Sequence, residues 1–268
     1  MISGLQNRKV NFARRLQAEK RCRQREAAFV VEGTRWLKEL VEQTHPVQLV
    51  FYTKDWQQQT NHQDILQQLS APTQLVSDDI MAAMSDTETP PGALAICQIK
   101  PLPLPPQPDF LLILDRVTTP GNLGTMLRTA AAAGVDGVLL TPGCVDAYNP
   151  KVLRGSMGAH LRLPVHTLSW QEIGEVTKGM AVWLTAVSQA TPYTTINWTE
   201  PSAIIIGNEA QGVGDEAEKM ANACTEHGRG GRLTIPMHHD TESLNAATAA
   251  AVILFEAARQ RRAVIGGR

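Results

Sequence analysis

The chain has 268 residues, enough for one large domain or two of ordinary size. Hydrophobic residues make up 43% of it and charged residues 19%, which excludes a disordered chain. The net charge of -1 does not by itself indicate a nucleic-acid-binding protein.

The cysteines and the apolar runs indicate the compartment. The cysteines (Cys22, Cys97, Cys144 and Cys224) are scattered without a CxxC pair, so we expect free thiols in a reducing compartment. No run approaches the roughly 18 apolar residues that a membrane span needs, and the first residues contain no apolar signal core. We therefore expect a cytoplasmic protein without a membrane segment.

The first 25 residues hold a dense basic block that the average charge hides. Its members are Arg8, Lys9, Arg14, Arg15, Lys20, Arg21, Arg23 and Arg25, against Glu19 on the acidic side. Such a block is suited to the phosphate backbone of RNA or DNA. A solvated helix face is the alternative, because runs of charge often have only that role.

The first hundred residues predict a mixed α/β module with no catalytic spacing. Helices are expected over residues 5–25, 34–43 and 63–70, and strands over 29–33, 47–53, 73–77 and 94–99. Thr34 is the expected cap of the second helix, because its hydroxyl can accept a hydrogen bond from an amide of the first turn.

A proline-rich stretch, KPLPLPPQPDF, runs from Lys100 to Phe110. Prolines at alternate positions can continue neither a helix nor a central strand, and they favour an extended, stiff spacer. We therefore place a linker at residues 101–108, between a first domain of residues 1–100 and a second of residues 109–268.

After the linker, apolar strands alternate with helices. Strands are expected over 110–117, 137–143, 162–168, 181–187, 202–210 and 232–237, and helices over 122–134, 149–159 and 243–262. The segment FLLILDRV at 110–117 is typical of a strand that is buried on both faces. This order predicts an α/β domain with a mostly parallel sheet covered by helices.

Ligands of parallel sheets bind beyond the carboxyl ends of the strands, and three unusual loops follow strands here. The first contains PGNLG at residues 120–124 and opens a helix, whose start favours anionic groups. It does not have the GxGxxG spacing of a dinucleotide site. Arg128 lies off the apolar stripe of that helix, so it is either functional or an arginine exposed to solvent.

The second loop, GNEAQGVGDE at residues 207–216, follows an apolar strand, and its glycines permit a tight bend against a ligand. The third, IPMHHDTESLN at residues 235–245, ends a strand and opens the last helix, with Ser243 as a natural cap. An ordinary turn and an ordinary helix cap are the alternatives for these two loops.

Together the three loops resemble the SpoU/TrmH family of RNA ribose methyltransferases, within the SPOUT superfamily. The family's first motif, Asn-x-Gly followed by Arg-Thr, corresponds to residues 122–124 and 128–129, and its last, Ile-Pro-Met and Ser-Leu-Asn, to residues 235–237 and 243–245. Its second, Gly-x-Glu-Gly-x-Gly, corresponds to residues 207–212 with Ala210 in place of a glycine. Residues 149–165 are similar to the family's middle segment, and His239 stands where many members have glycine.

The resemblance also covers the start of the chain. Residues 28–35, AFVVEGTR, are similar to the "fVvEGxr" segment of the family's N-terminal RNA-substrate domain. That domain has an L30e-like α/β fold. With the basic block just ahead of this segment, the first domain is expected to recognise RNA.

The resemblance implies a SPOUT-type parallel sheet with a C-terminal trefoil knot, and a homodimer with the active site at the dimer interface. S-adenosylmethionine would be the cofactor, bound in the knot at Gly207, Ile235, Met237 and Leu244. The substrate would be a structured RNA. Ribosomal RNA is favoured over transfer RNA, because many transfer-RNA enzymes of the family lack the N-terminal domain.

The reaction implied is in-line transfer of a methyl group from a sulfonium to a ribose 2′-oxygen, for which positioning is the main task. The family assigns the activating base to the counterpart of Arg128, although a guanidinium normally stays protonated. Arg128 would therefore be either a perturbed base or an anchor for the adjacent phosphate. Asn122, Glu209, Ser243 and Asn245 would orient Arg128, the ribose and the loops. The RNA contacts would come from Arg8, Lys9, Arg14, Arg15, Arg21, Arg23 and Arg25.

Two other functions stay open at this point. The first is a protein of the same fold that binds RNA without catalysing a reaction, although the site residues of the family are intact. A metal-dependent hydrolase that uses His238, His239 and Asp240 is the other. Neighbouring histidines in an extended segment point to opposite sides, and no HExxH motif completes a shell, so we expect no metal.

Overall fold

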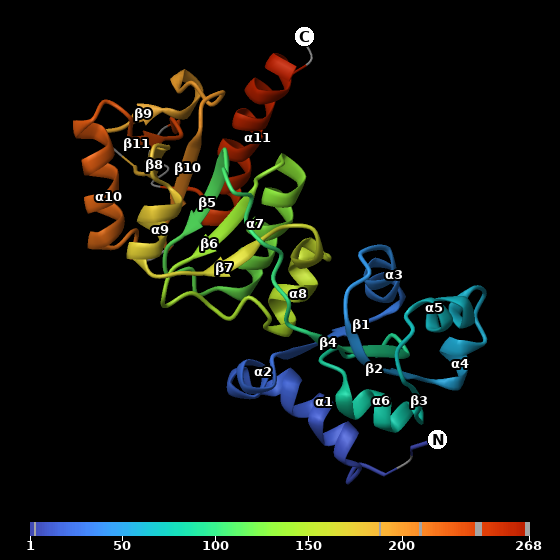
Figure 1. Ribbon diagram of the computed structural model, residues 1–268. Coiled ribbons are helices and arrows are strands. Elements are labelled where there is room, and N and C mark those ends of the chain that lie inside the picture. Colours follow the sequence, from blue (N-terminus) through green and yellow to red (C-terminus); the bar gives the residue numbers. More distant parts are fainter. Residues whose placement is uncertain (3, 188, 209–210, 239–242, 266–268) are drawn as a thin grey trace. The chain divides into compact units, whose positions relative to one another are not determined.

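The computed structural model describes residues 1–2, 4–187, 189–208, 211–238 and 243–265 (Figure 1). The chain forms two compact units. The N-terminal unit consists of Met1–Pro101 and Tyr148–Leu161, and the C-terminal unit of Leu102–Ala147 and Arg162–Arg268. One division falls within the proline-rich stretch. The units differ from the sequence-based limits at residues 148–161, which pack with the N-terminal unit.

The N-terminal unit is built on a 4-stranded sheet in the order β1-β4-β2-β3, with β4 antiparallel to both neighbours. Its strands are β1 (Ala28–Glu32), β2 (Val47–Tyr52), β3 (Thr73–Leu75) and β4 (Ala93–Gln98). Its helices are α1 (Arg8–Ala18), α2 (Lys20–Glu26), α3 (Thr34–Glu42), α4 (Lys54–Gln57), α5 (His62–Gln68), α6 (Asp78–Met84), α8 (Pro150–Ser156) and the 3-10 helix η1 (Ala159–Leu161). The helix expected over 5–25 is two helices that meet at Glu19.

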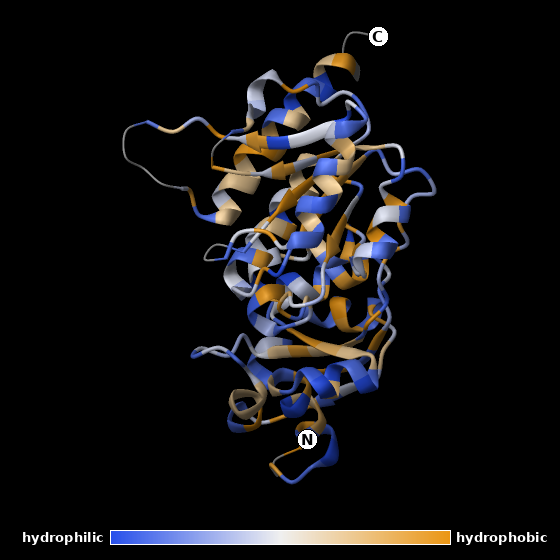
Figure 2. Cartoon of the chain, turned by 90° about the vertical axis from the view of Figure 1, so that its left-hand side faces the viewer, coloured by the Kyte–Doolittle hydropathy of each residue, from blue (hydrophilic) through white to orange (hydrophobic). Residues whose placement is uncertain are grey.

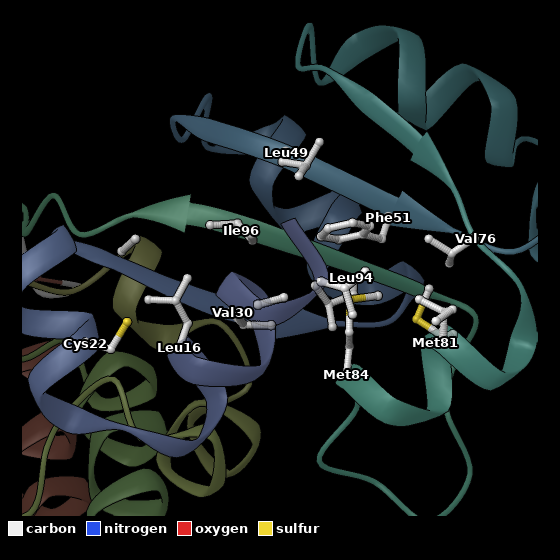
Figure 3. Packing of buried hydrophobic residues seen from close by; sticks show 14 residues of the cluster. Leu16, Cys22, Val30, Leu49, Phe51, Val76, Met81, Met84, Leu94 and Ile96 are labelled. Atoms are coloured by element: carbon white, nitrogen blue, oxygen red, sulfur yellow. The ribbon is translucent and has the colours of Figure 1, made fainter. Parts of the chain in front are cut away.

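Alternate residues of β1 face two hydrophobic clusters, because successive side chains of a strand point to opposite faces. In the first cluster, Leu16 of α1, Cys22 of α2 and Met84 of α6 pack with Val30 and Phe51 (Figure 3). The helices α1, α2 and α6 therefore cover one face of this sheet.

The opposite face is covered by α3, α5 and the segment from α8 to η1. Leu153 and Leu161 of that segment are buried there in one cluster with Phe29. The Tyr148 ring also lies against Phe29, with 5.0 Å between the ring centroids. These contacts explain why residues 148–161 belong to this unit.

The cap expected at Thr34 is wrong by one residue. Gly33 holds the cap position of α3 with a φ of 92°, in the left-handed region that favours glycine. Thr34 is the first helical residue, and its hydroxyl accepts a 2.8 Å hydrogen bond from the Trp56 indole. Its side chain therefore joins α3 to α4.

Arg23, which the sequence placed among the RNA-contacting residues, is a structural residue. It is only 2% exposed. Its guanidinium donates hydrogen bonds to the carbonyl oxygens of Leu16 at 2.6 Å and Gln17 at 3.1 Å. These carbonyls lie in the last turn of α1, where no helical amide can reach them. Arg23 therefore fastens α2 to the end of α1 and is not available to a phosphate.

The C-terminal unit is built on a 7-stranded sheet in the order β7-β6-β5-β10-β8-β11-β9. Its strands, β5 (Phe110–Leu114), β6 (Gly137–Leu140), β7 (Val165–Thr167), β8 (Ala181–Thr185), β9 (Thr191–Pro192), β10 (Ser202–Ile206) and β11 (Gly230–Thr234), pair in parallel. Its helices are α7 (Pro120–Ala133), α9 (Trp170–Val176), the 3-10 helix η2 (Tyr193–Thr195), α10 (Asp215–Glu226) and α11 (Ala246–Ile265). The predicted α/β class with a parallel sheet is confirmed.

The central strands β5 and β10 are buried along their full length. Figure 1 shows α9 and α10 on one side of this sheet and α7 and α11 on the other. Apolar residues accordingly concentrate in the strands (Figure 2). Burial on both faces explains the continuous apolar runs of the sequence. None of the described helices is long and apolar enough to cross a membrane.

The proline-rich stretch has no helix or strand, but it is not a free spacer. Leu104 packs against the hydrophobic core of the C-terminal unit. The His166 ring donates a 2.7 Å hydrogen bond to the Leu102 carbonyl. A side chain at Gly137, at the start of β6, would collide with Leu104. The stretch is therefore attached along β6 and β7.

Replacing Arg23 with alanine should lower the free energy of unfolding by about 2 kcal/mol, because two carbonyl oxygens at a helix end lose a buried charged donor. Arg21→Ala removes an exposed arginine of the same helix and should change this free energy by less than about 0.5 kcal/mol. Urea unfolding followed by circular dichroism measures both values. Equal stability of the two variants would contradict the structural role of Arg23.

Candidate active site

The three loops singled out from the sequence begin at one edge of the 7-stranded sheet. The strands β5, β10, β8 and β11 are neighbours and run parallel, so their carboxyl ends share this edge. Asp115, Gly207 and Ile235 are the first residues after β5, β10 and β11. Ligands of parallel sheets bind at this kind of edge.

The helix after the first loop, α7, begins at Pro120, two residues earlier than expected. Proline suits the first helical position because its φ is already helical. Asn122 therefore lies in the first turn of the helix. Arg128 follows on the exposed side, opposite the buried Leu123 and Met126. In the described part of the chain, no hydrogen bond or ion pair holds the Arg128 guanidinium.

The last helix, α11, begins at Ala246, and Asn245 caps it. The Asn245 Oδ1 atom accepts hydrogen bonds from the amides of Ala247 at 2.9 Å and Thr248 at 3.3 Å. The cap expected at Ser243 is therefore wrong. Ser243 is exposed and precedes the capping residue by two positions.

Asn245 also brings the first and third loops together. Its Nδ2 atom donates a 3.2 Å hydrogen bond to Oδ1 of Asn122, across 123 positions of sequence. One end of the amide thus caps α11 while the other holds the start of α7, which fixes the orientation of the side chain. The sequence assigned both residues to the site, and the structure places them in contact.

A cavity of about 430 Å³ lies among the loops that follow β8, β10 and β11. Gly207, Ile235, Met237 and Leu244, which the sequence assigned to the cofactor, all line it. Its other walls include the apolar Ile206, Leu233 and Ile253 and the polar Thr185, Asn208 and Ser243. A mostly apolar cavity of this size with a few polar groups suits a small organic cofactor.

The loop after β10 requires glycine because it folds back on itself. Asn208 and Gly212 are joined by two backbone hydrogen bonds of 2.9 Å. A Cβ atom on Gly207 would lie 2.6 Å from the carbonyl carbon of Gly212, which leaves no room for a side chain. This close approach of two backbone segments forms one wall of the cavity.

Sequence reasoning missed two residues at this edge. Asp115 is buried, and its carboxylate accepts hydrogen bonds from the Gly214 amide at 2.6 Å and the Thr141 hydroxyl at 2.9 Å. Asn208 donates from Nδ2 to the Arg116 carbonyl at 2.9 Å. The sequence signal for Asp115 was a carboxylate directly after a wholly apolar strand. A charged residue that is buried at such a position is expected to be paired.

Cys144 follows β6 at the same edge, but it is not suited to act as a nucleophile. Its thiol donates a 3.2 Å hydrogen bond to the Leu114 carbonyl. Burial raises the pKa of the Cys144 thiol, and hydrogen bonds from the Val117 and Thr141 backbone offset only part of this effect. The reactive thiolate is therefore disfavoured.

Part of the predicted site lies outside the described residues. Glu209 and Ala210 of the second loop, and His239 and Asp240 of the third, are among these, so the role expected for Glu209 stays a prediction. His238 is exposed. Among the described residues, no group of three or more His, Cys, Asp or Glu side chains could hold a metal ion.

In the N-terminal unit, the remaining basic residues of α1 and α2 are exposed: Arg8, Lys9, Arg14, Arg15, Lys20, Arg21 and Arg25. Arg15 forms an ion pair with Glu19 at 3.2 Å, and Arg25 forms one with Glu26 at 2.6 Å. Exposed pairs of this kind contribute little to stability. They therefore do not prevent these arginines from contacting a phosphate.

Two family matches cover both parts of the chain. Residues 109–255 match the SpoU rRNA Methylase family, and residues 7–95 match the MRM3-like substrate binding domain. The chain belongs to the SpoU rRNA methylase family. The family resemblance seen in the three loops is thereby confirmed.

Members of this family match the chain along almost its whole length. A protein of Synechocystis sp. named as an uncharacterized tRNA/rRNA methyltransferase is 35% identical over 97% of this chain and 94% of its own. The 23S rRNA (guanosine(2553)-2'-O)-methyltransferase RlmP of Bacillus subtilis is 32% identical over 95% of this chain and 97% of its own. Among solved structures, the SpoU methyltransferase AviRb of Streptomyces viridochromogenes in complex with AdoMet is 26% identical, with a TM-score of 0.86 over 96% of this chain and 99% of that one.

Replacing Gly207 with alanine should lower the free energy of unfolding by about 2 kcal/mol, because the new methyl group has to displace the backbone at Gly212. Gly174→Ala is the matched control, since a Cβ there meets its nearest neighbour, Met220, at an ordinary 3.8 Å. Gly174 lies within α9, where alanine is more favourable than glycine. This control should therefore raise the free energy of unfolding by up to about 1 kcal/mol. Thermal unfolding of both variants measures the difference. An unchanged melting temperature for the Gly207 variant would refute the close packing of the loop.

Proposed function

We propose that this chain transfers a methyl group from S-adenosylmethionine to the ribose 2′-hydroxyl of an RNA, with ribosomal RNA as the substrate. The arrangement at the sheet edge carries the proposal: the cavity lined by all four expected cofactor residues adjoins the loop that pairs Asn245 with Asn122. Relatives named as 23S rRNA 2'-O-methyltransferases favour ribosomal over transfer RNA. The free cysteines favour a reducing compartment, the cytoplasm.

The residues around the cavity fit S-adenosylmethionine. Gly207 lets a ligand approach the backbone at a point where a side chain has no room. Ile235 and Leu244 offer apolar contacts, and the backbone groups of these loops can serve as hydrogen-bonding partners. When bound, the cofactor would supply a methyl group on a sulfonium, whose sulfur would leave as a neutral thioether while the 2′-hydroxyl proton is released to water. AviRb, a structural relative, binds AdoMet.

Arg128 anchors the phosphate beside the target ribose in this proposal. Its guanidinium is exposed and offers donors but no acceptor, which favours an anchor over a base. Asn122 and Asn245 fix the start of the helix that carries it. Holding the phosphate places the 2′-hydroxyl in line with the methyl group, and such positioning supplies much of the rate enhancement. Ser243, at the cavity, and Glu209 orient the ribose and the loops.

The N-terminal unit recognises the RNA. The match of residues 7–95 to a substrate binding domain supports this role, as do the exposed basic residues of α1 and α2. We assign residues 1–100 to this RNA-recognition domain with an L30e-like fold, residues 101–108 to the linker and residues 109–268 to the catalytic domain, except that residues 148–161 pack within the N-terminal unit. The β4 strand between β1 and β2, with helices on both faces, is compatible with that fold.

The enzyme works as a homodimer in this proposal, with α7 and α11 at the interface. These helices pack side by side, and Arg262 donates a 3.4 Å hydrogen bond to the Ala132 carbonyl. The outer surface of α11 carries apolar side chains, since Phe255 is 46% exposed and Val264 is 49% exposed. Arg128 lies on the exposed side of α7. A second copy seated on this surface would place the active site at the dimer interface.

A C-terminal trefoil knot is proposed as well, and the strand order supports it. The chain leaves β11 on the far side of β8 from β10, whereas α11 packs against α7, which follows β5. Met237, before residues 239–242, and Ser243 and Leu244, after them, line the same cavity as Gly207 and Gly212 of the loop after β10. Passage of the last segment of the chain through that loop would close a knot, a rare topology in proteins.

Arg128→Ala should abolish methylation of ribosomal RNA while S-adenosylmethionine binds with unchanged affinity, because Arg128 is not among the residues that line the cavity. Arg229→Ala is the control, since this exposed arginine lies at the opposite, amino end of β11. Transfer of labelled methyl groups and titration calorimetry measure the two quantities. Near-normal turnover of the Arg128 variant would contradict the assignment. Wild-type protein that binds the cofactor but methylates no RNA would indicate a binding protein.

Replacing Arg8, Arg14 and Arg21 together with glutamine should weaken RNA binding without changing cofactor affinity. Each lost phosphate contact should make the slope of log affinity against log salt shallower by roughly 0.7 to 0.9. Fluorescence anisotropy with a labelled ribosomal RNA fragment at several salt concentrations measures this slope. Unchanged affinity and slope would show that the RNA binds elsewhere.

A further inference from the structure

We infer that Asp115 is a positioning residue for the cofactor, and that it acts by fixing the loop of residues 207–214 against the end of β5. The inference rests on the proposed function, because it takes the cavity to be the S-adenosylmethionine site. It concerns a buried carboxylate that does not line the cavity itself.

The Asp115 side chain is 2% exposed and connects three segments of the C-terminal unit. Its Oδ2 atom accepts a 2.6 Å hydrogen bond from the Gly214 amide, and its Oδ1 atom accepts a 2.9 Å hydrogen bond from the Thr141 hydroxyl. The Arg116 Nε atom lies 3.5 Å from Oδ2 and partly compensates the charge. A buried charge is maintained only when it is paired and hydrogen-bonded. Asp115 therefore links β5, the end of β6 and the loop after β10.

The loop is attached to the exit of β5 at both of its ends. Asp115 holds Gly214 at the far end. At the near end, Asn208 donates from Nδ2 to the Arg116 carbonyl at 2.9 Å and to the Thr118 hydroxyl at 3.3 Å. The residues that hold the loop therefore all belong to the short segment between β5 and α7, the helix that carries Arg128.

The backbone of the segment between β5 and α7 is strained at the point where the loop is attached. Arg116 has a φ of 53°, a left-handed conformation that costs energy in a residue other than glycine. A Cβ atom on Gly214 would lie 3.2 Å from the Arg116 Cζ atom, closer than an ordinary contact, and 3.4 Å from Asp115 Oδ2, so glycine lets the two segments approach without displacing the Arg116 side chain. Such strain persists only where the surrounding contacts enforce it.

The attached loop forms part of the cavity wall. Gly207, Asn208, Gly212 and Val213 belong both to the loop and to the lining. If the Asp115 contact is lost, the loop spends only part of the time in its binding-competent position. The apparent affinity for the cofactor falls in proportion to the fraction of molecules in that position. The chemical step at a fully loaded site should change much less.

Asp115→Asn tests this inference, because the amide has almost the same shape as the carboxylate. It places an N–H group near the Gly214 amide or the Thr141 hydroxyl, which are themselves donors. We expect the dissociation constant for S-adenosylmethionine, measured by calorimetry on the full chain, to rise about tenfold or more. The KM for the cofactor should rise in parallel, while kcat at saturating cofactor and the KM for RNA stay near the wild-type values. Thr141→Val removes the hydroxyl that donates to Asp115 without touching the cavity lining, so it should produce the same pattern, and it decides the matter if Asp115→Asn does not fold.

Asp109→Asn is the matched control, because it makes the same change at the opposite end of β5, where Asp109 pairs with Arg261. It should leave cofactor affinity unchanged. Wild-type cofactor affinity in both the Asp115 and the Thr141 variants would overturn the inference, and so would a loss confined to kcat or to thermal stability. Wild-type protein that binds no S-adenosylmethionine would instead overturn the proposed function, and the inference with it.

Discussion

The candidate site depends on the parallel pairing of four neighbouring strands, β5, β10, β8 and β11. Parallel strands place all their carboxyl ends at one edge, so the polar segments that follow them meet although they are far apart in the sequence. The strands β5 and β10 are buried on both faces and contribute only apolar side chains and Ser202. Their burial holds the edge rigid, while the chemistry lies in the loops.

The loops at this edge are held largely by hydrogen bonds between side chains and backbone. Asn245 caps α11 and holds Asn122 with the same amide group. Asp115 accepts from the Gly214 amide, and Asn208 donates to the Arg116 carbonyl. A side chain that bonds to backbone positions the whole segment. A few polar residues therefore position the loops around a cavity whose lining is mostly apolar.

In the N-terminal unit, the arginines of α1 and α2 fall into a buried and an exposed group. Arg23 is buried and satisfies carbonyl oxygens at the end of α1, whereas Arg8 and Arg14 of the same block are exposed. The segment of residues 148–161 completes the core of this unit, although it lies between β6 and β7 in the sequence. The chain therefore passes between the two units three times, and the N-terminal unit includes α8 with the residues on either side of it.

The sequence by itself determined the alternation of strands and helices, the parallel sheet and the residues at the sheet edge, because apolar periodicity and glycine or polar residues at strand ends are local signals. It also indicated that Asn122, Gly207 and Asn245 would share a site. Only the tertiary structure decided that Asn245 rather than Ser243 caps α11, that Arg23 is buried, that Asp115 holds the loop of residues 207–214 and that residues 148–161 join the N-terminal unit. Each of these depends on which distant groups come into contact, and a hydrogen bond across a hundred residues leaves no periodic pattern in the chain.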